Sequence, residues 1–98
     1  MYVITLTYTA SLDRIDDALE AHRAFLGRHF DSGVFIAAGP KVPRDGGIIL
    51  ASAIERAQLD AILASDPFAQ QQLAKYDVTE FNATRLALGL NLPEPALE

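Results

Sequence analysis

The sequence predicts an α+β fold of the ferredoxin-like type, with the element order βαββαβ and a four-stranded antiparallel sheet. Segments rich in apolar and β-branched residues, typical of strands, lie near the start, the centre and the end of the chain. Between them lie two segments whose apolar residues recur every three or four positions, as on one face of a helix. In this arrangement both helices cover one face of the sheet. We therefore expect the other face to be either wet or covered by a second copy.

The first expected elements are a strand and a helix. Residues 2–8 alternate in the manner of a strand, with apolar and aromatic side chains at every second position. Ser11 can cap the helix that follows, which is expected to reach residue 28 or 29. The turn sequence Asp31-Ser32-Gly33 then ends this helix.

The central part of the chain predicts a hairpin. Residues 34–38 and 47–51 are short apolar runs, and glycine and proline lie at their inner ends. We therefore expect these two strands to pair across residues 39–46.

The last expected elements are a helix and a strand. Ser52-Ala53-Ile54-Glu55 has the spacing of a capping box, so the second helix is expected to begin there. Its buried face is predicted to consist of Leu59, Ile62 and Leu63. Ser65-Asp66-Pro67-Phe68 interrupts this helix and starts a fresh turn through Leu73. Residues 76–86 then alternate as the final strand.

Composition excludes several classes of function. The 98 residues suffice for one core, and the absence of cysteine excludes disulfides, thiolate nucleophiles and sulfur-ligated metals. No apolar run approaches the roughly 20 residues of a membrane span, and residues 1–8 do not resemble a signal peptide. The net charge of −5 and the dispersed Lys and Arg residues argue against nucleic acid as a partner. We expect a cytoplasmic protein that binds neither membranes nor nucleic acid.

His22 is the most informative residue of the chain, because it lies inside the apolar stripe of the first helix. The stripe also contains Leu12, Ile15, Leu19, Leu26 and His29. An imidazole among leucines either finds a hydrogen-bond partner or costs about 1 to 3 kcal/mol, so a partner is expected elsewhere in the fold. His22 and His29 lie about 10 Å apart along the helix axis, too far to share a metal, and no metal site is expected. Arg23 belongs to the opposite, charged face, which predicts that it points away from a pocket.

Four short motifs resemble the YciI-like (YCII-domain) family. They are Ala21-His22-Arg23-Ala24-Phe25-Leu26, Ala38-Gly39-Pro40, Asp45-Gly46-Gly47 and Ser65-Asp66-Pro67-Phe68. The resemblance covers roughly residues 1–85 and implies a homodimeric α/β barrel, in which two sheets pack back to back. It also implies a pocket between helices and sheet for a small-molecule ligand. The histidine and aspartate of the family's His-Asp pair fall on His22 and Asp66.

The function predicted from this resemblance is that of a small enzyme without a cofactor, a lyase or isomerase of a small cyclic or aromatic polar substrate. A dehydrochlorinase of aromatic degradation belongs to the family. His22 would act as the base and Asp66 as the carboxylate that orients it, since such a carboxylate fixes the imidazole tautomer and raises its basicity. The residues expected to bind the substrate are Arg23, Gly39, Pro40, Asp45, Gly47 and Phe68.

Several of these residues have structural explanations as well. An aspartate before a proline is a common helix cap, which is the alternative for Asp66. His22 could bind a backbone carbonyl or water, and Asp45 could serve only in a turn. Lys41 and Arg44 form either a small positive patch for an anionic ligand or a solvated loop.

A second class of function therefore stays open. The chain could be a non-catalytic dimeric module that binds a small ligand or stabilises a partner protein. Its motivation is the scarcity of polar groups that could stabilise developing negative charge.

Residues 1–86 are expected to form the domain, and residues 87–98 a C-terminal arm. Leucines at every second position between 86 and 92 make this segment too apolar for a free tail, while its glycine and prolines make it too irregular for a helix. We expect the arm to pack on the partner subunit of a homodimer, or of a higher oligomer. The alternative is an arm folded back on its own subunit.

Overall fold

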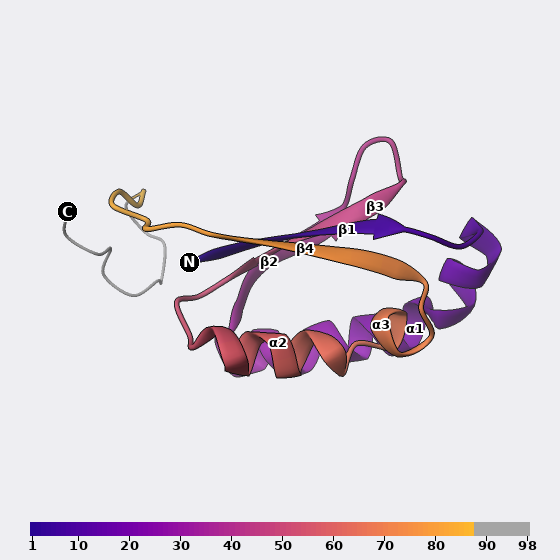
Figure 1. Cartoon of the computed structure of the whole chain (residues 1–98), viewed down its shortest axis with the longest axis horizontal. Helices are drawn as coiled ribbons and strands as arrows, with labels where there is room; N and C mark the ends of the chain where they lie inside the picture. The colour runs from indigo at the N-terminus through magenta and orange to yellow at the C-terminus, as the bar shows by residue number, and fades with distance from the viewer. Residues whose placement is uncertain (88–98) are drawn as a thin grey trace.

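The chain forms a four-stranded antiparallel sheet with its helices packed on one face (Figure 1). The computed structural model describes residues 1–87. The elements are β1 (Tyr2–Tyr8), α1 (Leu12–Asp31), β2 (Phe35–Pro40), β3 (Gly46–Ala51), α2 (Arg56–Ala64), α3 (Pro67–Gln70) and β4 (Ala74–Glu80). The strand order β2-β3-β1-β4 confirms the predicted ferredoxin-like fold. None of the helices within these residues is long and apolar enough to cross a membrane.

The core lies between the sheet and the helices. Every second residue of β1 points into it, so that Tyr2, Ile4 and Leu6 are at most 2% exposed. From the other side α1 contributes Ile15, Ala18, His22 and Phe25, and α2 contributes Leu59 and Leu63. Burial of each large apolar side chain stabilises the fold by about 1.5 to 3 kcal/mol. These contacts hold α1 against the sheet and thereby place His22.

The predicted capping box at Ser52 is wrong. Helix α2 begins at Arg56, and its N-cap residue Glu55 makes no side-chain hydrogen bond to the helix. Ser52 is buried, and its backbone N–H donates to the carbonyl of Val34 at 2.8 Å. The carbonyl of Ser52 in turn accepts the N–H of Ile54 at 2.9 Å, so the chain makes a tight turn after Ser52 and the helix begins only at Arg56.

Strand β4 is shorter than predicted. It ends at Glu80, opposite Tyr2, where its neighbour β1 begins. Beyond this point the sheet offers no further strand to pair with, although Phe81 still exchanges hydrogen bonds with Met1. Apart from Ala87, the arm predicted for residues 87–98 lies outside the described residues.

Gly46 marks a close approach of two strands near the cavity end of the sheet. It is buried at the start of β3 and pairs with Thr7 of β1. A Cβ atom added at Gly46 would overlap with the carbonyl oxygen of Leu6. Only glycine therefore fits here without a shift of the backbone.

We expect the substitution Gly46→Ala to lower the free energy of unfolding by about 1 to 3 kcal/mol, because the strands must move apart. Gly27→Ala is the matched control, since Gly27 lies in α1 with no atom within 4 Å of an added Cβ. That control should raise the free energy of unfolding by up to about 1 kcal/mol through helix propensity. Urea unfolding followed by circular dichroism measures both. Equal stability of the two variants would contradict the steric argument.

Candidate active site

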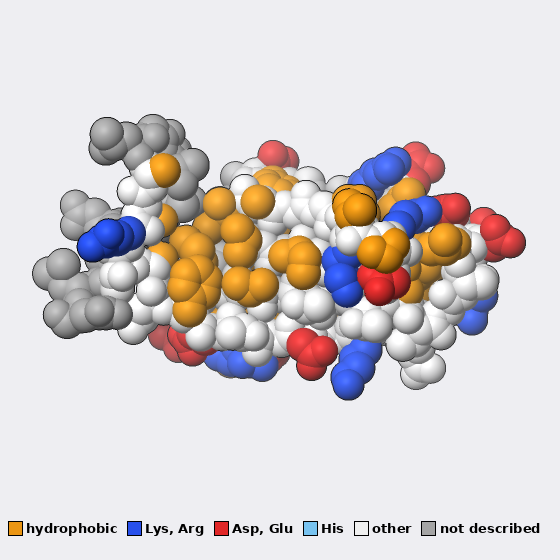
Figure 2. All heavy atoms as spheres, turned by 90° about the horizontal axis from the view of Figure 1, so that it is seen from above, with side chains coloured by type: hydrophobic (Ala, Val, Ile, Leu, Met, Phe, Trp, Pro, Cys, Tyr) orange, Lys and Arg blue, Asp and Glu red, His pale blue; other side chains and the backbone are white. Residues whose placement is uncertain are grey.

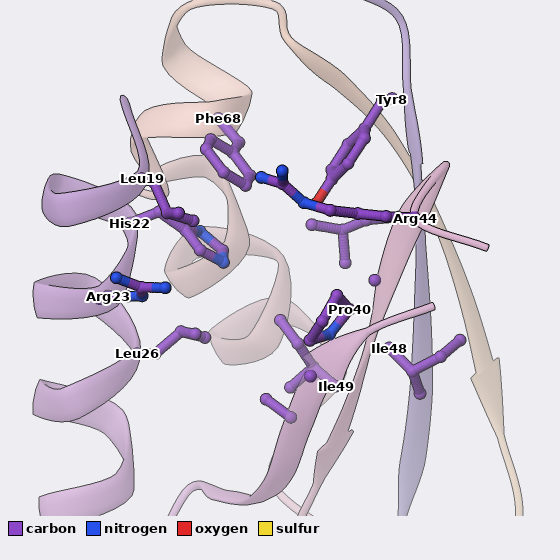
Figure 3. A pocket seen from close by; sticks show the side chains of 14 residues that line it. Tyr8, Leu19, His22, Arg23, Leu26, Pro40, Arg44, Ile48, Ile49 and Phe68 are labelled. Atoms are coloured by element: carbon purple, nitrogen blue, oxygen red, sulfur yellow. The ribbon is translucent and has the colours of Figure 1, made fainter. Parts of the chain in front are cut away.

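A cavity of about 390 Å³ lies between α1 and the sheet, beside the loop that joins β2 and β3 (Figure 3). Its apolar walls include Leu6, Leu19, Leu26, Pro40, Ile49 and Phe68. Its polar side chains are Tyr8, His22, Arg23 and Arg44. A mostly apolar wall with a few convergent polar groups is typical of a small-molecule pocket.

His22 meets a buried carboxylate behind the cavity wall. Its Nδ1 atom lies 2.8 Å from Oδ1 of Asp66, and Asp66 is fully buried. An ionised carboxylate only accepts hydrogen bonds, so Nδ1 carries the proton and Nε2 has the free lone pair. Within the described residues Nε2 has no protein partner, yet it is not a buried unsatisfied atom. Nε2 is therefore the ring nitrogen that is open to the cavity.

Asp66 is held by donors from three parts of the chain. Besides His22, its Oδ1 accepts the backbone N–H of Phe68 at 3.0 Å, which makes Asp66 the N-cap of α3. Its Oδ2 accepts the hydroxyl of Tyr76 in β4 at 2.5 Å. The sequence left open whether Asp66 caps a helix or binds His22. It does both, because its two oxygens offer enough lone pairs for all three donors.

Tyr76 stays a proton donor in this arrangement. Burial is the main cause that raises the pKa of its phenol well above the ordinary value, and the hydrogen bond and charge of Asp66 raise it further. The hydroxyl therefore remains protonated and directed at Oδ2. The signal for Tyr76 in the sequence was its position in an alternating strand, where it pairs with Leu6 and shares the helix-covered face.

The ring of Phe68 fixes the plane of the imidazole. The two rings are stacked, with centroids 3.9 Å apart and planes 5° from parallel. Phe68 follows Asp66 by two residues, so the same short segment supplies the carboxylate, the helix cap and the stacking ring. The hydrogen bond to Asp66 therefore fixes the direction of the His22 ring within its plane, and the stacking on Phe68 keeps the ring from tilting out of that plane.

Arg23 lines the cavity, although its helical position predicts that it points away; the family resemblance places it among the residues expected to bind the substrate. Leu19, Arg23 and Leu26 form a flank of α1 next to the buried stripe, and this flank faces the cavity (Figure 3). The charged head of Arg23 reaches the cavity because its side chain is long, although the residue is exposed.

Arg44 was predicted only as part of a positive patch, but it also lines the cavity. Its Nη2 atom lies 2.6 Å from Oδ1 of Asp16 in α1, so this arginine connects the β2–β3 loop to the helix. The hydrogen bond to Asp16 is the main cause that raises the pKa of Arg44, and Tyr8 adds to it. The guanidinium therefore stays charged.

Of the residues predicted to bind the substrate, Asp45 lies outside the cavity lining. Its carboxylate is exposed and 3.2 Å from Nζ of Lys41, while its backbone carbonyl accepts the N–H of Tyr8. These contacts fit the turn role that was the alternative for Asp45. The remaining predicted residues do line the cavity; they are Arg23, Gly39, Pro40, Gly47 and Phe68.

The second histidine is part of an aromatic cluster at the end of α1. The centroid of the His29 ring lies 4.9 Å from the ring centroid of Phe25 and 5.3 Å from that of Phe35. Burial lowers the pKa of His29, and the charge of Arg28 lowers it further. Within residues 1–87 no group of three or more His, Cys, Asp or Glu side chains lies close enough to hold a metal ion.

Comparison with known proteins agrees with this fold. The chain is similar in structure to 5-chloro-2-hydroxyhydroquinone dehydrochlorinase (TftG) from Burkholderia phenoliruptrix AC1100, solved in complex with 2,5-dihydroxybenzoquinone. The match has a TM-score of 0.69 at 18% sequence identity and covers 83% of this chain and 93% of that chain. No curated protein matches the sequence. Residues 1–82 match the YCII-related domain, and the chain therefore belongs to the YCII-related domain family.

Proposed function

We propose that the protein is a small lyase or isomerase that uses His22 and Asp66 as an acid-base dyad on a small cyclic or aromatic polar substrate. The observation that carries the proposal is the 2.8 Å contact of Nδ1 with Oδ1 behind a cavity to which Nε2 is open. In this geometry Nε2 can take a proton from a bound substrate. Asp66 then stabilises the imidazolium that forms, as the carboxylate of a catalytic triad does.

The structural neighbour supports a choice of reaction within this class. It is a dehydrochlorinase, and its complex contains a small oxygenated ring. In an elimination of this kind the chlorinated phenol first tautomerises to a ketone, as a hydroxyl loses its proton and the ring carbon that bears chlorine gains one and becomes tetrahedral. Nε2 of His22 then takes the proton of another ring hydroxyl. The electron pair of that O–H bond forms a C=O bond, the ring double bond shifts toward the tetrahedral carbon, and chloride leaves with the pair of the broken C–Cl bond. In an isomerisation the same proton returns to another atom of the ring. Neither route needs a cofactor for its balance of atoms and electrons.

The dyad is tested with a panel of hydroxylated and chlorinated rings that includes 5-chloro-2-hydroxyhydroquinone, by measuring chloride release and rearrangement. For a compound that is turned over, we expect His22→Gln and Asp66→Asn each to lower kcat about 10² to 10⁴-fold, the usual range for a general base and its orienting carboxylate.

His29→Gln is the matched control, since His29 lies outside the cavity lining, and it should keep the wild-type kcat. Full activity of His22→Gln would contradict the dyad. If members of the panel bind and none is converted, the protein is instead a non-catalytic module that binds a small ligand.

Tyr76 is proposed to position the dyad rather than to touch the substrate. We expect Tyr76→Phe to lower the free energy of unfolding by about 1 to 3 kcal/mol, because Oδ2 of Asp66 loses its donor while buried. Chemical denaturation measures this loss. Tyr8→Phe is the matched control, because it removes a hydroxyl from a half-buried tyrosine ring beside the cavity. It should lower the free energy of unfolding by less than Tyr76→Phe does. Equal losses would show that Tyr76 contributes no more than an ordinary tyrosine hydroxyl.

We further propose that a second copy of the chain covers the helix-free face of the sheet. Alternation along β1 and β3 places Val3, Ile48 and Leu50 on this face, where Val3 pairs with Leu50. All three are only half-buried in the single chain. Figure 2, seen from this side, shows hydrophobic side chains gathered over the sheet. A face of this kind is typical of a subunit interface.

The substitution Leu50→Lys should convert a dimer to a monomer, because it places a charge at the centre of the proposed interface. Light scattering coupled to size-exclusion chromatography measures the mass. Leu12→Lys is the control, since Leu12 is 46% exposed at the start of α1, and it should leave the mass unchanged. A wild-type protein that is monomeric at high concentration would refute this proposal.

A further inference from the structure

Two arginines line the cavity although the protein as a whole is acidic, while the carboxylates of Asp16 and Asp66 contact Arg44 and His22 from outside the lining. The chain has a net charge of −5, yet the described residues that line the cavity include Arg23 and Arg44 and no Asp or Glu. Both guanidiniums are ionised at any ordinary pH. An imbalance of this kind in a cleft with apolar walls attracts anions, because low-dielectric walls focus the field of the charges.

Within residues 1–87 Arg23 has no counter-ion of its own. Among residues 1–87 the ion pairs involve Lys41, Arg44, Arg56 and His22, and no carboxylate lies within 4.0 Å of Arg23. It nevertheless lines the cavity, and in Figure 3 its guanidinium lies beside α1, below His22. Its donors are therefore available to a bound molecule.

The side chain of Arg44 is held in place before any ligand binds. The contact of its Nη2 with Asp16 fixes one corner of the guanidinium and leaves the other donors of the fork unused by that contact. In Figure 3 the side chain crosses the cavity toward Phe68, with Tyr8 beside it. Arg23 thus reaches the cavity from α1 and Arg44 reaches it from the β2–β3 loop. His22 lines the same cavity.

The remaining walls of the cavity favour a flat ligand with an apolar surface. Leu19, Leu26, Pro40 and Ile49 offer no hydrogen bonds from their side chains, and the ring of Phe68 adds an aromatic wall. A sugar or a free phosphate would leave much of this surface unused. A ring with one charged edge would use both the walls and the arginines.

We infer that the substrate is an anionic ring compound, whose carboxylate, phenolate or enolate oxygen is bound by Arg23 and Arg44. The inference rests on the proposed function, because it gives the substrate class of the same site. When Nε2 of His22 takes a proton from a ring hydroxyl, or from a tetrahedral ring carbon beside a carbonyl, negative charge develops on an oxygen that is conjugated with the ring. The two guanidiniums stabilise the charge that develops there. They supply polar groups of the kind whose scarcity in the sequence favoured a non-catalytic module.

The test compares benzoate with benzamide, two rings of nearly equal shape that differ in charge. Binding to the full chain is measured by NMR titration in mildly alkaline buffer. We expect benzoate to bind at least about tenfold more tightly than benzamide, as for a charge-assisted hydrogen bond. Arg23→Gln and Arg44→Gln should each weaken benzoate about tenfold and leave benzamide unchanged.

Arg28→Gln is the matched control, because it removes one positive charge from the same helix but lies outside the cavity lining. It should leave the affinities of both probes unchanged. Since Arg44→Gln also breaks the contact with Asp16, Asp16→Asn is compared with it. That variant keeps the guanidinium and should keep the preference for benzoate.

Equal affinity of the two probes, or no binding of either at the cavity, would overturn the inference. The inference would also be overturned if Arg28→Gln lost as much affinity for benzoate as the two cavity variants, because the preference for benzoate would then come from the overall charge of the protein. The dyad proposal is judged separately by the activity of His22→Gln. A preference for benzoate together with full activity of His22→Gln would refute the dyad and leave the anion site standing.

Discussion

The buried carboxylate of Asp66 is the constraint on which the rest of the site depends. A charged group removed from water is tolerated only when its oxygens are fully hydrogen-bonded. Here the donors come from α1 through His22, from α3 through the backbone of Phe68, and from β4 through Tyr76. The one group therefore ties two helices and a strand together. The position of the imidazole at the cavity is a direct result of satisfying this charge.

Local patterns predicted most of the fold, because each strand and helix buries one face and so has a periodic sequence. The same reasoning predicted that His22 needs a partner, because an imidazole embedded in an apolar stripe is unusual, whereas Asp66 was identified as that partner through the resemblance to the YCII family. It failed at Ser52, whose backbone is taken by a neighbouring strand. Such a bond joins residues far apart in sequence and leaves no local signal.

The polar groups of the cavity were harder to predict than its histidine. Periodicity assigns Arg23 to the charged face of α1, because it describes where the Cα lies and ignores the length of the side chain. Arg44 reaches the cavity only through the path of a loop, and loop paths do not follow from sequence patterns. Asp45, one residue further along, ends up outside the cavity for the same reason.

Asp66 serves the fold and the proposed chemistry with the same atoms, and this has a consequence for how relatives of this chain are compared. A descendant that no longer catalysed anything would still need a residue that caps α3 and accepts the tyrosine hydroxyl. Selection for folding alone would then preserve the aspartate. Arg23 has no such structural duty, because it is exposed and without an ion pair among the described residues. Retention of that arginine is thus a better marker of a working pocket than retention of the histidine's partner.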